Sequence, residues 1–170
     1  PEVALSLYIL DNLPSESIVN LANEWLTEGI FTESLSEIIF EKSPSMSTIG
    51  PLFESALKEI GIDTPTKIEA AKVVLKDTIQ KMVSGETDLM EGANFIYWNI
   101  HHKITDELPD GEYLGTNLRL EYIFCWLREI WDCRDGSMIL YYSDLPRDQA
   151  EKKFLAHLKE EAEKWLTIKI

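Results

Sequence analysis

Apolar residues recur at intervals of three and four along most of this chain, and Pro or Gly separates one run from the next. This spacing gathers apolar side chains on one face of an α-helix, which has about 3.6 residues per turn. The first clear run lies between Pro14 and Gly29 and consists of Ile18, Leu21, Ala22, Trp25 and Leu26. The pattern therefore predicts an all-α fold.

Seven or eight helices follow from these runs and from the residues that bound them. The predicted helices cover about residues 15–28, 32–41, 51–61, 64–84, 88–100, 117–134 and 146–165. Pro51 is placed at the start of the third helix, because proline lacks an amide hydrogen and is tolerated in a first turn. Thr64 is taken as the N-cap of the fourth helix, directly before Pro65.

Two segments fit a strand as well as a short helix. Apolar residues alternate over residues 3–9, and residues 138–142 form a short apolar run. The two could pair as a small ribbon. No repeat, low-complexity tract or linker divides the chain. We predict an all-α, single-domain bundle over residues 1–170, with a minor two-stranded β element as an open alternative.

Length and composition favour an ordinary folded protein. A chain of 170 residues with 45% apolar content can bury about 70% of its unfolded surface, so folding needs neither a disulfide nor a metal. Cys125 and Cys133 would lie about 12 Å apart along one helix and could not bridge each other. The apolar run Val3 to Leu10 lacks a basic flank and is too short to span a bilayer. We expect a cytoplasmic protein that makes no membrane contact.

Histidines are the first candidates for chemistry. His101 and His102 are adjacent, and adjacent side chains on a helix point about 100° apart, so the pair cannot bind one ion from a regular helix. No H-x-x-x-H or E-x-x-H pair accompanies them. We interpret both as surface or last-turn histidines and His157 as boundary packing, and we predict neither a metal site nor a cofactor.

Carboxylate pairs keep a magnesium-dependent enzyme open as an alternative. Helical nucleotide pyrophosphatases hold Mg²⁺ with such pairs on facing helices, and this chain is similar in having Glu129 with Asp132 and the acidic run at 160–163. The similarity is partial, because Lys164 stands where the doubled motif requires a glutamate. The sequence also lacks a nucleophile elbow and a glycine-rich phosphate loop. We predict no catalytic residue and favour a non-enzymatic protein.

The N-terminal region is strongly acidic. Residues 1–41 contain eight carboxylates and no Lys or Arg, within a chain of net charge −14. Each like-charged pair at four-residue spacing disfavours a helix by about 0.2–0.5 kcal/mol. The glutamates at this spacing are Glu24, Glu28, Glu33, Glu37 and Glu41. We predict that they bind a basic protein partner, with a merely solvated face as the alternative.

A second acidic cluster surrounds the turn at residues 109–111. It consists of Asp106, Glu107, Asp110, Glu112 and the aromatic Tyr113. Carboxylates can steer a basic partner and a tyrosine can anchor it, so the cluster is a second candidate partner-binding site. A nucleic acid is not expected as a partner, because its phosphates would be repelled.

One family resemblance bears on the fold. Leu57, Glu59, Ile60 and Gly61, followed by Ile79, Gly85 and Glu91-Gly92-Ala93, resemble the pattern of a family of uncharacterised helical bacterial proteins. The resemblance covers the middle third of the chain and implies a bacterial protein with an all-helical core. It supplies no catalytic residue.

The chain is also similar, in class and charge only, to bacterial immunity proteins. These are often small, acidic and helical, because they neutralise basic nuclease toxins. We therefore expect a non-enzymatic, acidic protein-interaction domain, with an immunity protein as its most concrete form. A magnesium-dependent hydrolase and a homo-oligomeric structural protein, for example a homodimer, are the alternatives.

Overall fold

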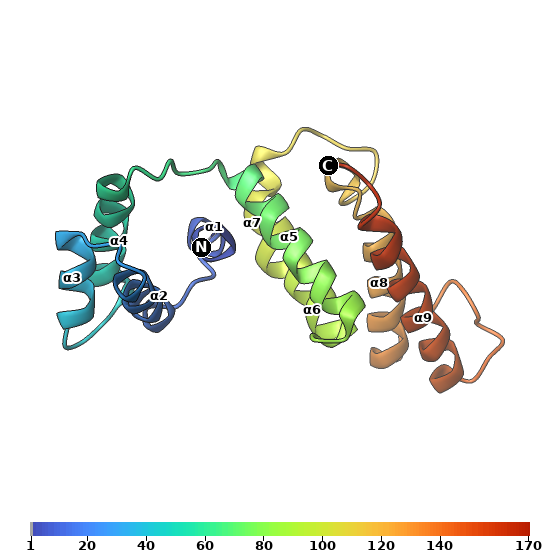
Figure 1. Cartoon of the computed structure of the whole chain (residues 1–170). Coiled ribbons are helices and arrows are strands. Elements are labelled where there is room, and N and C mark those ends of the chain that lie inside the picture. Colours follow the sequence, from blue (N-terminus) through green and yellow to red (C-terminus); the bar gives the residue numbers. More distant parts are fainter. Residues whose placement is uncertain (1) are drawn as a thin grey trace. The chain divides into compact units, whose positions relative to one another are not determined.

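The computed structural model describes residues 2–170, and its regular elements are all helical (Figure 1). This confirms the predicted all-α class. The chain divides into two compact units, Pro1–Ala70 and Ala71–Ile170, and the boundary falls within the first turn of α5 (Lys67–Ser84). We call them the N-terminal and the C-terminal unit. The prediction of a single domain over residues 1–170 stays a prediction.

The N-terminal unit contains α1 (Glu2–Ile9), α2 (Ser15–Thr27), α3 (Glu33–Phe40) and α4 (Met46–Ile60). α3 packs against both α2 and α4. At the centre of this core, the ring of Phe53 contacts Tyr8 edge-on at 5.0 Å between centroids and stacks on Trp25 at 6.0 Å. The fully buried aliphatic residues around them are Ile18, Leu35, Ile38 and Ile49. One apolar core thus joins helices from the whole length of the unit.

Local signals end several of these helices. Thr32 caps α3, because its side chain accepts a hydrogen bond from the Leu35 amide at 3.1 Å. At the C-terminal end of α4, Gly61 adopts a left-handed conformation with φ of 79°, which favours glycine. These ends agree with the predicted ones.

α4 begins five residues earlier than predicted. The predicted start at Pro51 is wrong, since the helix starts at Met46 and contains Pro51 within it. Ser45 and Thr48 form a capping box that satisfies the first amides of the helix. Ile49 in this added turn is fully buried, and its burial offsets the one backbone hydrogen bond that Pro51 cannot donate.

The minor β element that the sequence left open does not occur within residues 2–170. Residues 3–9 belong to α1, where Tyr8 donates hydrogen bonds to the Gly50 carbonyl at 3.3 Å and to Glu54 at 2.9 Å. Most side chains of this segment are at least partly buried, so apolar residues occur on every side and the alternation does not identify a strand.

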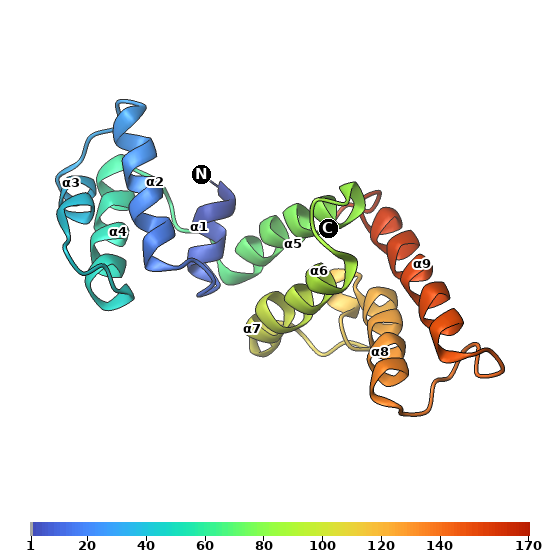
Figure 2. The same cartoon turned by 90° about the horizontal axis from the view of Figure 1, so that it is seen from below.

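The C-terminal unit holds the rest of α5 and the elements that follow it. These are α6 (Leu89–Phe95), the π-helical turn η1 (Ile96–His101), α7 (His102–Ile104), the short 3-10 turns η2 (Thr105–Glu107) and η3 (Thr116–Leu118), α8 (Glu121–Asp135) and α9 (Arg147–Trp165). α8 and α9 form an antiparallel pair (Figure 2). Trp165 donates to the Leu118 carbonyl at one end of this pair, and Arg147 donates to the Cys133 carbonyl at the other.

The start of α5 also differs from the prediction. Thr66, and not Thr64, caps the helix, because its hydroxyl accepts from the Glu69 amide at 3.2 Å while the Glu69 carboxylate accepts from the Thr66 amide at 2.8 Å. This reciprocal pair satisfies two amides that a first turn leaves open. Residues 64 and 65 therefore precede the helix.

The second segment that fitted either a strand or a short helix, residues 138–142, lies in the loop between α8 and α9. The carboxylate of Glu129 accepts hydrogen bonds from the amides of Leu140 at 2.9 Å and Tyr141 at 3.4 Å. A side chain therefore takes the place that a neighbouring strand would have filled. Arg147 secures the start of the loop, since its guanidinium donates to four carbonyls between residues 132 and 137.

Two further expectations concern cysteines and membranes. Cys125 and Cys133 both lie on α8 and are free thiols, as their spacing requires. Within residues 2–170, no helix has both the length and the apolar character that a membrane-spanning segment needs.

Candidate partner-binding surfaces

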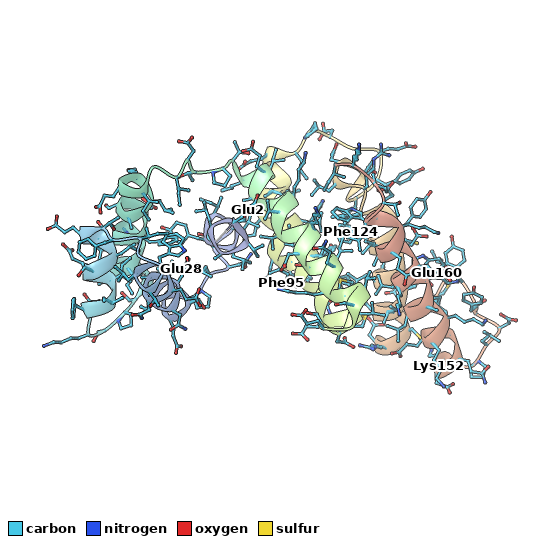
Figure 3. The ribbon with its side chains drawn as sticks, viewed as in Figure 1. Glu2, Glu28, Phe95, Phe124, Lys152 and Glu160 are labelled. Atoms are coloured by element: carbon cyan, nitrogen blue, oxygen red, sulfur yellow. The ribbon has the colours of Figure 1, made fainter. Side chains whose placement is uncertain are left out.

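Four of the five N-terminal glutamates are exposed on α2, at its C-cap or on α3, and Glu41 is half-buried directly after α3. Glu24 and Glu28 are exposed at the C-terminal end of α2, where Figure 3 labels Glu28. Glu33 and Glu37 are exposed one turn apart on α3. α3 ends at Phe40, so Glu41 leaves the stripe and accepts a hydrogen bond from the Ser43 amide at 3.1 Å. The structure thus brings Glu33 and Glu37 onto one helix face and separates Glu41 from them.

Two exposed aromatic side chains accompany these carboxylates. Phe31 is 74% exposed directly before the Thr32 cap, and Phe40 is 77% exposed at the end of α3. Phe40 follows Glu33 by seven residues and Glu37 by three, so the three share one face of the helix. Glu28 and Phe31 are also exposed in the segment that leads into this helix, and we call the five residues Glu28, Phe31, Glu33, Glu37 and Phe40 together the acid–aromatic face. No Lys or Arg occurs between residues 24 and 41.

Sequence reasoning missed the aromatic members of this face, although one signal was present. Phe40 follows the buried Leu35 by five residues, which places it about 140° around the helix from the core side. A large apolar residue on the polar side of an amphipathic helix was therefore readable from spacing. Phe31 lies outside the helix and carried no such signal.

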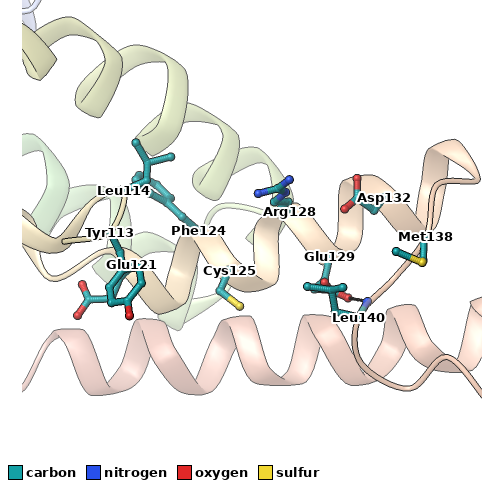
Figure 4. A pocket seen from close by; sticks show the side chains of 10 residues that line it. All are labelled: Tyr113, Leu114, Glu121, Phe124, Cys125, Arg128, Glu129, Asp132, Met138 and Leu140. Carbon is teal, nitrogen blue, oxygen red and sulfur yellow. Dashed lines mark hydrogen bonds between the residues drawn. The ribbon is translucent and has the colours of Figure 1, made fainter. Parts of the chain in front are cut away.

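A groove of about 430 Å³ lies within the C-terminal unit (Figure 4). Its walls come from two loops: Tyr113 and Leu114 from one, Met138 and Leu140 from the other. All four wall side chains are more than half exposed. Its floor is one stripe of α8, formed by Glu121, Phe124, Cys125, Arg128, Glu129 and Asp132. We call this feature the α8 groove.

The polar groups of the groove floor differ in their environment. The inner oxygen of Glu121, Oε2, is buried and has no hydrogen-bond partner. Burial, reinforced by the neighbouring charge of Glu129, raises the pKa of the Cys125 thiol, which disfavours the thiolate. Glu129 is only 2% exposed and is held by the two loop amides. Among the floor carboxylates, Glu121 and Asp132 are thus the ones left for a ligand.

The second acidic cluster adjoins this groove. Asp106, Glu107, Asp110 and Glu112 are exposed in the segment that leads to Tyr113. Asn117 donates to the Pro109 carbonyl at 2.6 Å, and Thr116 accepts from the Tyr113 amide at 3.1 Å. These bonds fix the loop, so that the tyrosine singled out from sequence stands at the groove wall. Trp98 is about half exposed, stacks on Trp131, and does not line the groove.

Three carboxylates of the magnesium alternative have other contacts. Glu129 holds the loop after α8, Glu161 pairs with Lys164 at 2.7 Å, and Glu160 lies 3.4 Å from His157. Within residues 2–170, no group of three or more His, Cys, Asp or Glu side chains is arranged to hold a metal ion. The described geometry therefore offers this alternative no assembled site.

The histidines divide into a buried and a boundary case. His101 was interpreted as a surface or last-turn histidine, and it lies in the last turn of η1. It is not at the surface, since it is 5% exposed and its ring contacts the Phe124 ring at 5.1 Å between centroids. His157 is half-buried and stacks on Trp126 at 4.4 Å, with a hydrogen bond of 2.7 Å to the Tyr142 hydroxyl. That placement agrees with boundary packing.

The burial of His101 makes the stability of the C-terminal unit depend on pH. Burial lowers the pKa of this imidazole below 6.5, with a smaller effect of His102. The folded state therefore favours the neutral form of His101. The contribution of this neutral form to the free energy of unfolding is complete above the pKa that His101 has in the unfolded chain, and it is lost as pH falls through the pKa of the folded state. We expect the wild type to lose more stability between about pH 6.5 and pH 5 than His101→Gln. Hydrogen exchange of the amides of α6 and α8, measured at both pH values, reports this loss of stability.

The exposed neighbour provides the control for this experiment. His102→Gln should keep most of the pH dependence of the wild type, because burial of His101 is the larger cause of its lowered pKa and the exposed His102 is the smaller one. Equal pH dependence in the wild type and in His101→Gln would show that the buried imidazole is not the titrating group.

Comparison of the chain with family models, with curated proteins and with solved structures finds no match. The inference of function therefore rests on the acid–aromatic face and the α8 groove.

Proposed function

We propose that this chain is a non-enzymatic, acidic protein-interaction domain whose acid–aromatic face binds a basic protein. The observation that carries the proposal is the exposure of Phe31 and Phe40 beside Glu33 and Glu37. Exposed aromatic side chains contribute disproportionately to protein interfaces, because they bury much apolar area with few rotatable bonds. Carboxylates around them select a partner of opposite charge.

The charge of the whole N-terminal unit supports the same partner. Residues 1–70 contain twelve carboxylates and three lysines, a net charge of −9. A field of this sign accelerates the encounter with a basic protein and weakens as salt is added. Neutralisation of a basic toxin, as bacterial immunity proteins achieve, is the most concrete form of this function. This more specific proposal rests on the similarity of the chain to bacterial immunity proteins in size, charge and helical class.

Partner capture with charge-reversed protein tests the proposal. The tagged full chain is used to capture proteins from an extract of its native host, and bound proteins are identified by mass spectrometry. We expect a partner rich in Lys and Arg, retained about tenfold less by Glu33→Lys/Glu37→Lys and released from the wild type at about 0.5 M salt. Phe40→Ala should also reduce retention, because it removes an aromatic anchor.

A variant of equal charge separates the face from general electrostatics. Glu2→Lys/Asp63→Lys changes two exposed carboxylates of the same unit that lie outside the face, and it should retain the partner much better than the Glu33/Glu37 variant. An acidic partner, or undiminished capture by the Glu33/Glu37 variant, would contradict the proposal. Capture of the chain itself, confirmed by sedimentation, would favour the oligomeric alternative.

A further inference from the structure

We infer that the α8 groove is a second binding site, which takes a short polypeptide segment with aliphatic side chains and a central lysine or arginine. The site lies wholly within the C-terminal unit and is independent of the acid–aromatic face. Its floor runs from Glu121 to Asp132 on α8, a length of about 16 Å at 1.5 Å per residue. A segment of five extended residues has about this length. The volume of about 430 Å³ is within the range of ligand sites.

The apolar part of the occupant follows from the walls. Tyr113, Leu114, Met138 and Leu140 are each more than half exposed and face one groove from two loops (Figure 4). Single exposed apolar residues are ordinary, but here two pairs line one concave surface, one pair near each end of its floor, and so indicate an interaction site. An aliphatic side chain placed against either pair would remove apolar surface of both molecules from water.

The cationic part follows from the carboxylates. Glu121 lines the groove and is partly exposed, while its Oε2 atom is buried without a hydrogen-bond donor. This carboxylate has lost hydration on its inner side, so a cation at its accessible side restores an interaction that the fold does not provide. Glu129 and Asp132 are the two other carboxylates of the floor, and Arg128 is its single cation.

Carboxylates near the groove also favour a positive charge on the bound segment. Asp110 and Glu112 are exposed immediately before Tyr113 at the groove wall, and they extend the negative potential beyond the floor. Glu129 contributes its charge but is held by the loop amides. A lysine or arginine also suits the apolar walls, because its aliphatic stem can lie against them while its charged end reaches Glu121. An acidic segment would meet repulsion at the same positions.

Peptide binding by the full chain tests this inference. Two fluorescently labelled peptides are compared by anisotropy; they share the same aliphatic residues and differ only in a central lysine or glutamate. We expect the lysine peptide to bind the wild type about tenfold more tightly than the glutamate peptide. Glu121→Gln should remove most of this preference, and Leu140→Ser should weaken both peptides, because it takes apolar area from the wall.

A carboxylate outside the groove provides the control for peptide binding. Glu163→Gln removes an exposed carboxylate on α9 outside the groove and should bind like the wild type. Unchanged helix content and hydrogen exchange show that each variant is folded. The inference is overturned if neither peptide saturates below about 1 mM, if both bind equally, or if Glu121→Gln keeps the preference. Self-association abolished by Leu140→Ser, without peptide binding, would assign the groove to a second copy and likewise overturn it.

The outcome is separable from that of the proposed function. Glu33→Lys/Glu37→Lys leaves every groove residue in place, so it should bind the lysine peptide like the wild type even where it fails to capture the basic partner. Loss of peptide binding in that variant would contradict the independence of the two sites.

Discussion

Replacing Phe53 with alanine is expected to destabilise the N-terminal unit by about 3–5 kcal/mol. The ring is fully buried, contacts Tyr8 edge-on and stacks on Trp25. Its removal leaves a cavity between α1, α2 and α4 that the surrounding helices can close only in part. Because whole domains are stable by only about 5–15 kcal/mol, the loss is a large fraction of the stability available.

Hydrogen exchange measured by mass spectrometry reports this loss for each unit separately. Amides of α4 near Ala56 and Leu57 should exchange far faster in Phe53→Ala than in the wild type. Phe40→Ala makes the same chemical change at a side chain that is 77% exposed, and we expect it to alter stability by no more than about 0.5 kcal/mol. Wild-type protection in Phe53→Ala would show that this ring does not hold the core together.

The same measurement tests the prediction of a single domain. If Phe53→Ala also exposes the amides of α8 and α9, the two units unfold as one cooperative system. If exchange rises in the N-terminal unit alone, each unit unfolds by itself. The compactness of the units does not decide between these outcomes, because cooperativity is a property of free energies and not of shape.

Helix ends were predictable where the signal is local. Thr32 caps α3 and Gly61 ends α4, because a hydroxyl acceptor and a left-handed glycine act on amides and carbonyls within a few residues. The side chain of Asp88 likewise accepts from the Met90 and Glu91 amides at the start of α6. Two equally local capping pairs, Thr66 with Glu69 and Ser45 with Thr48, were nevertheless not identified, because the nearby Pro65 and Pro51 were taken as the starts of their helices.

Elements set by distant contacts were not predictable. The first turn of α4 forms around Pro51 because Ile49 is buried in a core that α2 and α3 complete. Residues 3–9 are helical because Tyr8 packs on Phe53 and bonds to Glu54. In each case a local preference was outweighed by tertiary packing.

The candidate sites show the same division. Exposed glutamates on α2 and α3 were predictable, since charged residues off the apolar stripe of a helix face solvent. The α8 groove was not predicted, and Tyr113 alone among its residues was a predicted partner-binding residue, because the groove walls join loops more than twenty residues apart in the sequence. The role of Glu129 was also hidden: it was a candidate metal ligand by spacing, and the structure uses it to hold backbone amides.

The loop that supplies one groove wall depends on Gly115, and its replacement with alanine is expected to cost the C-terminal unit about 2–5 kcal/mol. Gly115 has φ of 85°, where a side chain costs about 1–2 kcal/mol. A Cβ atom there would lie 2.8 Å from two ring carbons of Phe124 and 3.0 Å from the Leu120 Cβ. Forcing these groups apart adds about 1–3 kcal/mol, and it displaces the groove floor at Phe124. Urea unfolding and binding of the lysine peptide should both register the change.

Gly136 offers a control with nearly the same backbone. Its φ is 87°, but no atom lies within 4 Å of an added Cβ. Gly136→Ala should therefore cost only the conformational part, about 1–2 kcal/mol. The difference between the two variants isolates the contact with Phe124, since the backbone cost cancels. Equal losses would show that the Phe124 ring yields without cost, in which case Gly115 is required for its backbone conformation alone and does not fix the position of the groove floor.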